Sequence, residues 1–180
     1  MSTTIYAVLG LLNIEPMSGY DIRQNLDESL SYFWSESYGQ IYPTLKKLEA
    51  ARLIAPVKQA TSETRRRKLY TVTAAGRARL RSWLSEPPRP QPPRNELLLK
   101  LFFGREAAPG TSAAHIRRLR VQQERTATAL EELERRLKAE RRGHPDLRYW
   151  LLAVSFGLER AQSLIDWSEL ALRAVDDERA

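Results

Sequence analysis

Apolar residues in the first 50 positions recur at helical spacing and predict three short helices. Their apolar faces are formed, in chain order, by Ile5, Val8, Leu9 and Leu12, by Ile22, Leu26 and Leu30, and by Ile41, Leu45 and Leu48. Ser18 is the expected N-cap of the second helix, because its hydroxyl can accept a hydrogen bond from an unpaired amide. Ser37 and Gln40 have capping-box spacing for the third. Pro43 follows soon after, so we expect that helix to be distorted there or to begin a few residues later.

Two segments with the composition of strands follow the third helix. Residues 53–57 are mostly apolar, and Pro56 suits an edge strand because proline lacks the amide that a central strand needs. Residues 67–73 contain the run Leu-Tyr-Thr-Val-Thr, which favours a strand. The polar segment 58–66 between them predicts a hairpin. Thr73 is the expected N-cap of a fourth helix, whose inward residues are Leu80, Trp83 and Leu84.

A proline-rich segment at 87–93 divides the chain. Its five prolines in seven residues fit neither a helix nor a central strand, so an extended spacer is predicted. We therefore expect a first domain at 1–86, a linker at 87–93 and a second domain at 94–180.

The second domain is predicted to be helical. A short apolar helix is expected at 97–103, followed by two long helices at about 112–142 and 147–175, with Gly143 and Pro145 at the turn between them. Their apolar seams alternate steps of three and four, as in a coiled coil. The seam positions are Ile116, Leu119, Gln123, Thr126, Leu130, Leu133 and Leu137, then Leu147, Leu151, Val154, Leu158, Ala161, Ile165, Ser168, Leu172 and Val175. The pattern predicts an antiparallel helical hairpin.

The last helix carries more apolar surface than one partner helix can cover, because Trp150, Leu164, Trp167 and Ala171 widen its seam. A broad exposed apolar stripe usually marks an interface, so we expect a homodimer. Trp150 and Trp167 have two interpretations. They could form an aromatic wall for a flat apolar effector, or they could simply pack in the dimer interface, where aromatic residues are enriched.

Composition argues against enzyme chemistry. There is no cysteine, which excludes disulfides, thiolate catalysis and cysteine-based zinc sites. Neither His115 nor His144 has a carboxylate at metal-ligand spacing, and no phosphate-binding glycine loop or nucleophile elbow is present. We expect no catalytic residue, no metal and no cofactor. No signal peptide is evident, and no run approaches the roughly 20 apolar residues that span a bilayer. A cytoplasmic protein without a membrane partner is the expectation.

The order helix, strand, basic turn, strand is typical of a winged helix-turn-helix that binds double-stranded DNA. The formal net charge of +7 suits an anionic partner. Glutamine can bind adenine, lysine can reach guanine or phosphate, and hydroxyl groups donate to phosphates. The alternative is an ordinary solvated face. The candidate DNA-contacting residues at this helix are Ser37, Tyr38, Gln40, Tyr42, Thr44, Lys46 and Lys47.

Four consecutive cations, Arg65, Arg66, Arg67 and Lys68, lie where the turn of the wing enters the second strand. Alternate side chains of a strand face opposite ways, so either Arg65 and Arg67 or Arg66 and Lys68 would contact phosphates. The alternative is an edge charge that deters strand aggregation.

Four segments resemble the PadR family of bacterial transcriptional regulators: Ile5-Tyr-Ala-Val-Leu-Gly-Leu-Leu12, Ser18-Gly-Tyr-Asp-Ile22, Tyr38-Gly-Gln-Ile-Tyr-Pro-Thr-Leu-Lys-Lys-Leu-Glu49 and Arg66-Arg-Lys-Leu-Tyr-Thr-Val-Thr-Ala-Ala-Gly76. The spacer and the paired long helices are similar to the virulence-activator-like C-terminal domain of longer members. The resemblance implies that Pro43 is tolerated in the recognition helix. It also implies that Tyr20 contacts the DNA backbone, with core packing as the alternative. Ala50-Ala-Arg-Leu53 departs from the family's usual acidic residues and glycine, which could alter a turn but not the fold.

We therefore expect a mainly α protein: a winged helix-turn-helix with a small β-hairpin wing, then an antiparallel long-helix dimerisation domain. The family resemblance implies a dimeric repressor, in some members an activator, that releases DNA when a small aromatic or hydrophobic molecule binds. The alternative function is a protein-interaction adaptor whose winged helix does not read DNA. Steep salt dependence of duplex binding would distinguish the two.

Overall fold

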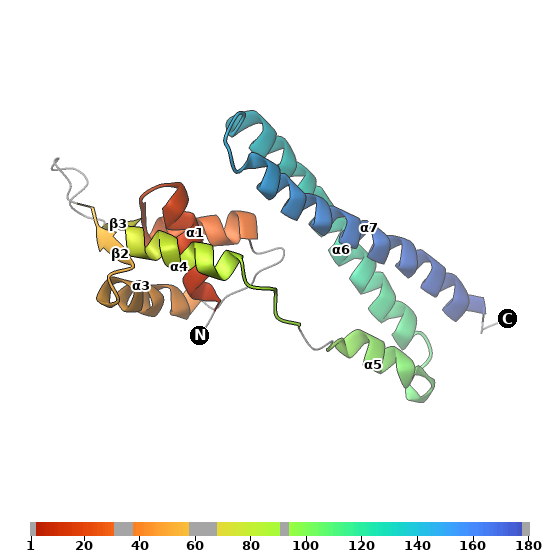
Figure 1. Cartoon of the computed structure of the whole chain (residues 1–180). Helices are drawn as coiled ribbons and strands as arrows, with labels where there is room; N and C mark the ends of the chain where they lie inside the picture. Colours follow the sequence, from red (N-terminus) through yellow and green to blue (C-terminus); the bar gives the residue numbers. More distant parts are fainter. Residues whose placement is uncertain (1–2, 31–37, 58–67, 91–93, 178–180) are drawn as a thin grey trace. The chain divides into compact units, whose positions relative to one another are not determined.

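A computed structural model describes residues 3–30, 38–57, 68–90 and 94–177. The chain is mainly helical, with one small sheet, and it divides into two compact units, Met1–Pro90 and Gln91–Ala180 (Figure 1). The predicted fold class is confirmed.

The N-terminal unit combines short helices with a three-stranded antiparallel sheet. The helices are α1 (Thr4–Ile14), α2 (Gly19–Asn25), which continues as a π-helical turn over Leu26–Leu30, α3 (Ile41–Ala50) and α4 (Ala74–Leu84). The strands are β1 (Met17–Ser18), β2 (Ile54–Pro56) and β3 (Leu69–Val72), in the order β1-β3-β2. Strand β1 was not predicted, because two residues are too few to show a period of two. Pro56 does lie on an edge strand, as expected.

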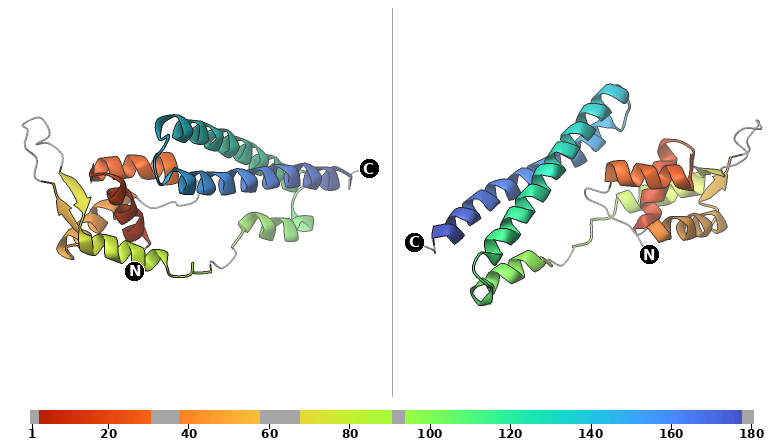
Figure 2. Two further views of the ribbon diagram at one scale, coloured as in Figure 1. Left: turned by 45° about the horizontal axis from the view of Figure 1, so that its top comes forward. Right: turned by 180° about the vertical axis from the view of Figure 1, so that it is seen from behind.

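Helix α1 lies at the centre of this unit and packs against α2, α3, α4 and β3 (Figure 2). Its apolar stripe was predicted too narrow, because Tyr6 and Leu11 are buried together with Val8, Leu9 and Leu12. The aromatic rings of Tyr6 and Trp83 stack with their centroids 4.4 Å apart. A helix surrounded by neighbours buries most of its circumference.

Two of the three predicted helix caps, Ser18 and Thr73, are confirmed. The hydroxyl of Ser18 accepts a hydrogen bond from the amide of Asp21 (3.2 Å), and the carboxylate of Asp21 accepts one from the amide of Ser18 (2.9 Å). The hydroxyl of Thr73 accepts one from the amide of Gly76 (3.1 Å). The prediction that Leu84 faces inward is wrong, since its side chain is 66% exposed. Trp83 occupies the inward position of the last turn, and a neighbouring helical residue points about 100° away.

Of the two alternatives for the third helix, the later start is the one that the structure has. A 3-10 turn over Tyr38–Gln40 precedes α3, and Gln40 makes no side-chain cap bond. Pro43 is then the third residue of the helix, where its missing amide needs no intrahelical partner. Ser37 itself lies outside the described residues.

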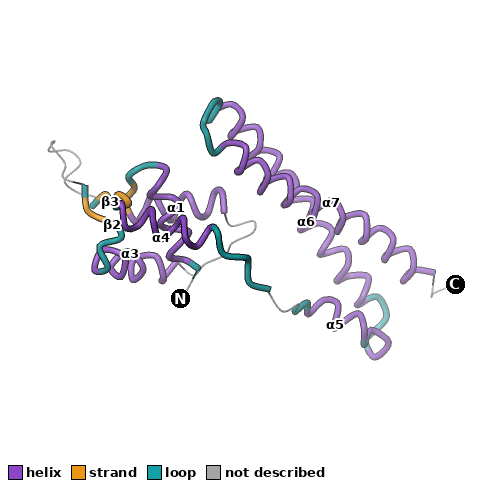
Figure 3. The backbone as a smooth tube through the Cα atoms, viewed as in Figure 1, coloured by secondary structure: helices purple, strands orange, loops and turns teal. Residues whose placement is uncertain are grey.

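The C-terminal unit contains a short helix and a long antiparallel hairpin (Figure 3). The elements are α5 (Glu96–Phe102), a 3-10 turn at Gly104–Glu106, α6 (Thr111–Glu140) and α7 (Leu147–Asp177). Gly143 has φ of +83°, a left-handed value that glycine adopts without steric cost, and it forms the turn as predicted. A Cβ atom at Gly157 would lie 2.8 Å from Cδ1 of Leu130, so the two helices approach closely there.

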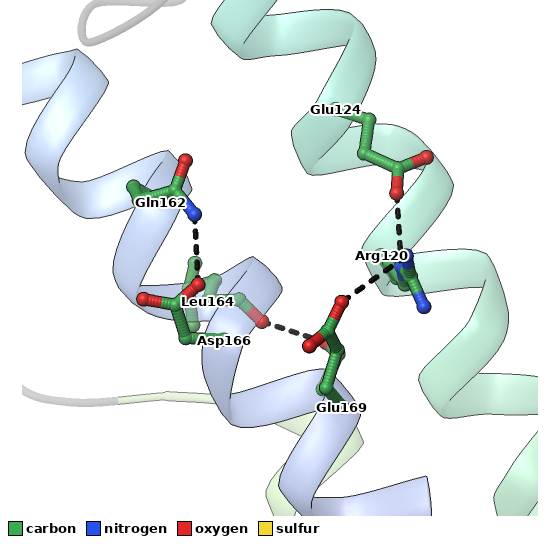
Figure 4. A network of polar contacts seen from close by, with 7 residues as sticks. Arg120, Glu124, Gln162, Leu164, Asp166 and Glu169 are labelled. Atoms are coloured by element: carbon green, nitrogen blue, oxygen red, sulfur yellow. Dashed lines mark hydrogen bonds and ion pairs between the residues drawn. The ribbon is translucent and has the colours of Figure 1, made fainter.

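Polar contacts accompany the apolar seam of α6 and α7 (Figure 4). Arg120 binds Glu124 in its own helix (2.8 Å) and Glu169 of α7 (3.2 Å). The hydroxyl of Ser168 is buried and donates to the carbonyl oxygen of Leu164 (2.7 Å), so it leaves no unpaired polar group in the seam. Such partly exposed ion pairs add at most about 1 kcal/mol to the free energy of unfolding. The Arg120–Glu169 pair nevertheless links α6 to α7 at one position along the hairpin.

The predicted seam faces inward, but the unpaired apolar surface lies elsewhere than expected. Trp150, Leu164, Trp167 and Ala171 are each half-buried. The exposed apolar side chains are Tyr149, Leu152, Phe156 and Leu170 of α7, Val121 of α6, and Leu98, Leu99, Phe102 and Phe103 on or beside α5. Three of those on α7 are spaced by multiples of seven, which makes a second apolar row on the helix.

Within the described residues, no helix is both long and apolar enough to cross a membrane.

The start of α4 lies directly against the backbone that follows α3. A Cβ atom at Gly76 would collide with the carbonyl oxygen of Leu53 and lie 2.7 Å from Cγ2 of Val72. That same carbonyl oxygen accepts hydrogen bonds from the amide and the hydroxyl of Thr73, both at 3.0 Å. Only glycine at position 76 permits this approach.

We predict that Gly76→Ala lowers the free energy of unfolding by about 3 kcal/mol, because the backbone it meets cannot move aside cheaply. Gly10→Ala is the matched control. No atom lies within 4 Å of a Cβ at Gly10 in the middle of α1, so alanine there should raise stability by about 0.5–1 kcal/mol. Thermal and urea unfolding of the full chain, followed by circular dichroism, measures both. Equal stability of the two variants would contradict the role of Gly76.

Candidate nucleic-acid interface

Helices α2 and α3 meet where two exposed tyrosines lie. A Cβ atom at Gly19 would be 2.8 Å from the ring of Tyr42 and 3.2 Å from Cδ1 of Leu45, so glycine allows the start of α2 to touch α3. The side chains of Tyr20 and Tyr42 are 53% and 59% exposed. The alternative prediction for Tyr20, that its side chain packs in the core, is therefore wrong. Both hydroxyl groups belong to a surface that a partner can reach.

Helix α3 separates inward apolar residues from outward polar ones. Gln40, Tyr42, Lys46 and Lys47 are exposed, while Ile41, Leu45 and Leu48 are buried. The prediction that Thr44 faces outward is wrong, because its side chain is only 6% exposed. Positions 41, 44, 45 and 48 share one helical face, so the buried stripe is wider than the three apolar residues indicated. The side chains of Ser37 and Tyr38 lie outside the described part.

Of the four predicted wing cations, Lys68 is described, whereas Arg65, Arg66 and Arg67 lie outside the described residues. The Lys68 ammonium donates to both carboxylate oxygens of Glu49, at 2.8 and 2.9 Å. It also lies 5.0 Å from the ring centroid of Tyr70. The hydrogen bond to Glu49 is the main cause that raises the pKa of Lys68 above its usual range. Sequence reasoning missed Glu49, because residues 19 positions apart show no periodic signal.

Helix α3 ends in a left-handed turn at Arg52, whose φ is +57°. The amide of Arg52 donates to the carbonyl oxygen of Glu49, and the amide of Leu53 donates to that of Leu48, both at 2.9 Å. Glycine usually occupies this position, because other residues pay about 1–2 kcal/mol for the left-handed conformation. The Ala50-Ala-Arg-Leu53 departure thus leaves the turn in place but strained.

Trp150 and Trp167 do not form one aromatic wall within a protomer. Both lie on the continuous helix α7, and 17 residues of α-helix span about 25 Å. Trp150 stacks instead on His144 at the hairpin turn, with ring centroids 4.6 Å apart. A single small ligand could contact only one of them in the same protomer. The role of either tryptophan as an effector contact stays a prediction.

Comparison with known proteins identifies the family. Residues 8–82 match the transcriptional regulator PadR-like family, and residues 93–176 match the family described as virulence activator alpha C-term. Over 176 residues the chain is 30% identical to the negative transcriptional regulator PadR of Bacillus subtilis. The match covers 95% of this chain and 96% of that protein. The chain belongs to the PadR-like family of transcriptional regulators. Members of the PadR-like family are regulators and not enzymes, in agreement with the sequence analysis.

Solved structures extend the likeness of this PadR-like chain to both units. Bacillus subtilis PadR in complex with operator DNA is 29% identical, with a TM-score of 0.81, and the match covers 97% of this chain and 98% of that one. The same protein in complex with p-coumaric acid gives a TM-score of 0.77 at 29% identity, over 97% and 99% of the two chains. The resemblance inferred from four short segments therefore holds along nearly the whole sequence.

Proposed function

We propose that this PadR-like chain is a dimeric, sequence-specific DNA-binding repressor, whose operator affinity falls when a small aromatic or hydrophobic effector binds. One observation carries the proposal. The likeness covers almost the full length of a negative regulator that has been solved both with operator DNA and with p-coumaric acid. The protein acts in the cytoplasm, where bacterial DNA lies.

We assign DNA binding to residues 1–86, the linker to 87–93 and dimerisation to 94–180. Helix α3 enters the major groove, where Gln40 and Lys46 read base edges. The hydroxyl groups of Tyr20 and Tyr42 donate to phosphates. The remaining contacts come from Ser37, Tyr38 and Lys47 at the helix and from the wing, through either Arg65 and Arg67 or Arg66. Thr44 is left out because it is buried.

Dimerisation is supported by the exposed apolar side chains of the C-terminal unit. Phe102 is 82% exposed, and Leu152, Phe156 and Leu170 are each about two-thirds exposed. Apolar side chains exposed together on neighbouring turns are usually covered by a partner. A two-fold dimer would place two α3 helices on half-sites one duplex turn apart, roughly 34–36 Å. An effector that binds better to a dimer with another spacing would lower operator affinity.

The DNA-contact assignment predicts two different mutational signatures. Replacing Arg65, Arg66 and Arg67 with Ala should weaken binding to every duplex and flatten the salt dependence, by about 0.9 in slope for each phosphate that is no longer neutralised. Replacing Gln40 or Lys46 with Ala should cost about 1–3 kcal/mol on the operator and less on random DNA. The operator is first found by selection from random duplexes, and titrations by fluorescence anisotropy at several salt concentrations measure both.

Arg81→Ala, on the exposed surface of α4, serves as the control and should leave the salt slope unchanged. If the wing triple variant kept the wild-type affinity and slope, the wing would not contact phosphates. A wild-type chain that binds duplex DNA without salt dependence would favour the adaptor function instead.

The dimer should depend on the exposed apolar side chains of α7. We predict that Leu152→Glu with Phe156→Glu converts the chain to a monomer, because two buried carboxylates would oppose the interface. Leu84→Glu, an equally exposed apolar residue of the N-terminal unit, should leave the dimer intact. Light scattering at micromolar concentration measures the mass of each variant. A monomeric wild-type chain would contradict the assignment.

Phenolic acids such as p-coumaric acid are the first effectors to test. A true effector should lower operator affinity, and operator should lower effector affinity by the same factor. Because Trp150 and Trp167 lie about 25 Å apart along α7, at most one of Trp150→Phe and Trp167→Phe should abolish ligand-induced quenching in a site within one protomer. A compound that quenches emission without changing operator affinity is a bystander. If no phenolic or drug-like compound changes DNA binding, the sensor function is refuted.

A further inference from the structure

The ion pair between Glu49 and Lys68 joins two parts of the proposed DNA-binding surface. Glu49 lies in the last turn of α3, and Lys68 immediately precedes β3, the strand that leaves the wing segment 58–67. Both carboxylate oxygens of Glu49 accept from the one ammonium of Lys68, at 2.8 and 2.9 Å, so the contact holds the start of β3 close to the end of α3.

The position of Glu49 at the end of α3 explains why the carboxylate is stabilised by a nearby cation. A carboxylate in the last turn of a helix lies at the negative end of the helix dipole, where it is disfavoured by itself. The Lys68 ammonium offsets that repulsion, and the ring of the buried Tyr70 flanks it at 5.0 Å. Lys68 is thus held from two sides, although its side chain remains 54% exposed.

The ion pair with Glu49 also makes Lys68 less able to bind a DNA phosphate. A phosphate would have to displace a bidentate carboxylate that already neutralises the ammonium, and the released Glu49 would then lie near the phosphates. An ammonium that stays paired releases no counterion on binding and adds nothing to the salt slope. Lys68 should therefore differ from an unpaired wing cation.

We propose that Glu49 and Lys68 form a clamp that holds the base of the wing against α3, with Lys68 as a positioning residue and not a phosphate contact. The proposal rests on the proposed function, because the clamp matters only if α3 and the wing bind one duplex together. Without the clamp, α3 and the wing can each still bind DNA, but they are no longer aligned before binding, and the affinity for the operator falls.

The test compares Lys68→Met, Glu49→Gln, the double variant and the charge swap Glu49→Lys with Lys68→Glu, each in the full chain. Either single variant should lower operator affinity about three- to ten-fold, since an exposed pair is weak but occurs twice in a dimer. Lys68→Met should leave the salt slope unchanged. The double variant should be no worse than either single one. The swap should restore most of the affinity. Arg67→Met is the neighbouring comparator and should flatten the slope.

The clamp would be overturned by a salt slope that falls by about 0.9 in Lys68→Met, by tighter binding of Glu49→Gln, or by a swap that stays as weak as the single variants. Unchanged affinity in both single variants would overturn it as well. Thermal unfolding of each variant separates a folding defect from a binding defect. If the wild-type chain binds no duplex, the proposed function fails, and the clamp fails with it. If the wild type binds, any of the other results refutes the clamp alone.

Discussion

The carbonyl oxygen of Leu53 is the contact on which the N-terminal unit depends. It accepts two hydrogen bonds from Thr73 and touches the backbone of Gly76, so the chain leaving α3 and the chain entering α4 cross at one point. Strands β2 and β3 run from this crossing toward the wing, and α3 ends just before it. The orientation of α3 relative to β2 and β3 therefore follows from a crossing that requires a residue without a side chain.

The C-terminal unit is organised on a different principle. Its two long helices bury few residues completely, and Ser168 interrupts their seam with a polar group satisfied inside its own helix. Much of the apolar surface of α5 and α7 stays uncovered in a single chain. A unit of this kind gains stability from association more than from its own interior, which suits the proposed dimerisation domain.

Local chemistry was predictable from the sequence wherever a periodic pattern or a cap determined it. The Ser18 and Thr73 caps, the long helices and the Gly143 turn follow from such signals. What could not be predicted depends on contacts between distant segments. Strand β1 exists because β3 lies beside it, Thr44 is buried because α3 packs across a wide face, and Glu49 meets Lys68 only once the sheet has formed. The distance of about 25 Å between Trp150 and Trp167 could have been calculated from their separation of 17 residues in one predicted helix.

The left-handed conformation of Arg52 affects how often the turn at the end of α3 opens, as well as the path of its backbone. Steric strain of about 1 kcal/mol in the folded turn lowers the free energy of opening that turn by the same amount, which is roughly a five-fold rise in the open population. Amide hydrogens at the end of α3 should therefore exchange with solvent sooner than those at its centre. An arginine codon becomes a glycine codon through one base substitution, so a relaxed version of this turn lies a single mutation away.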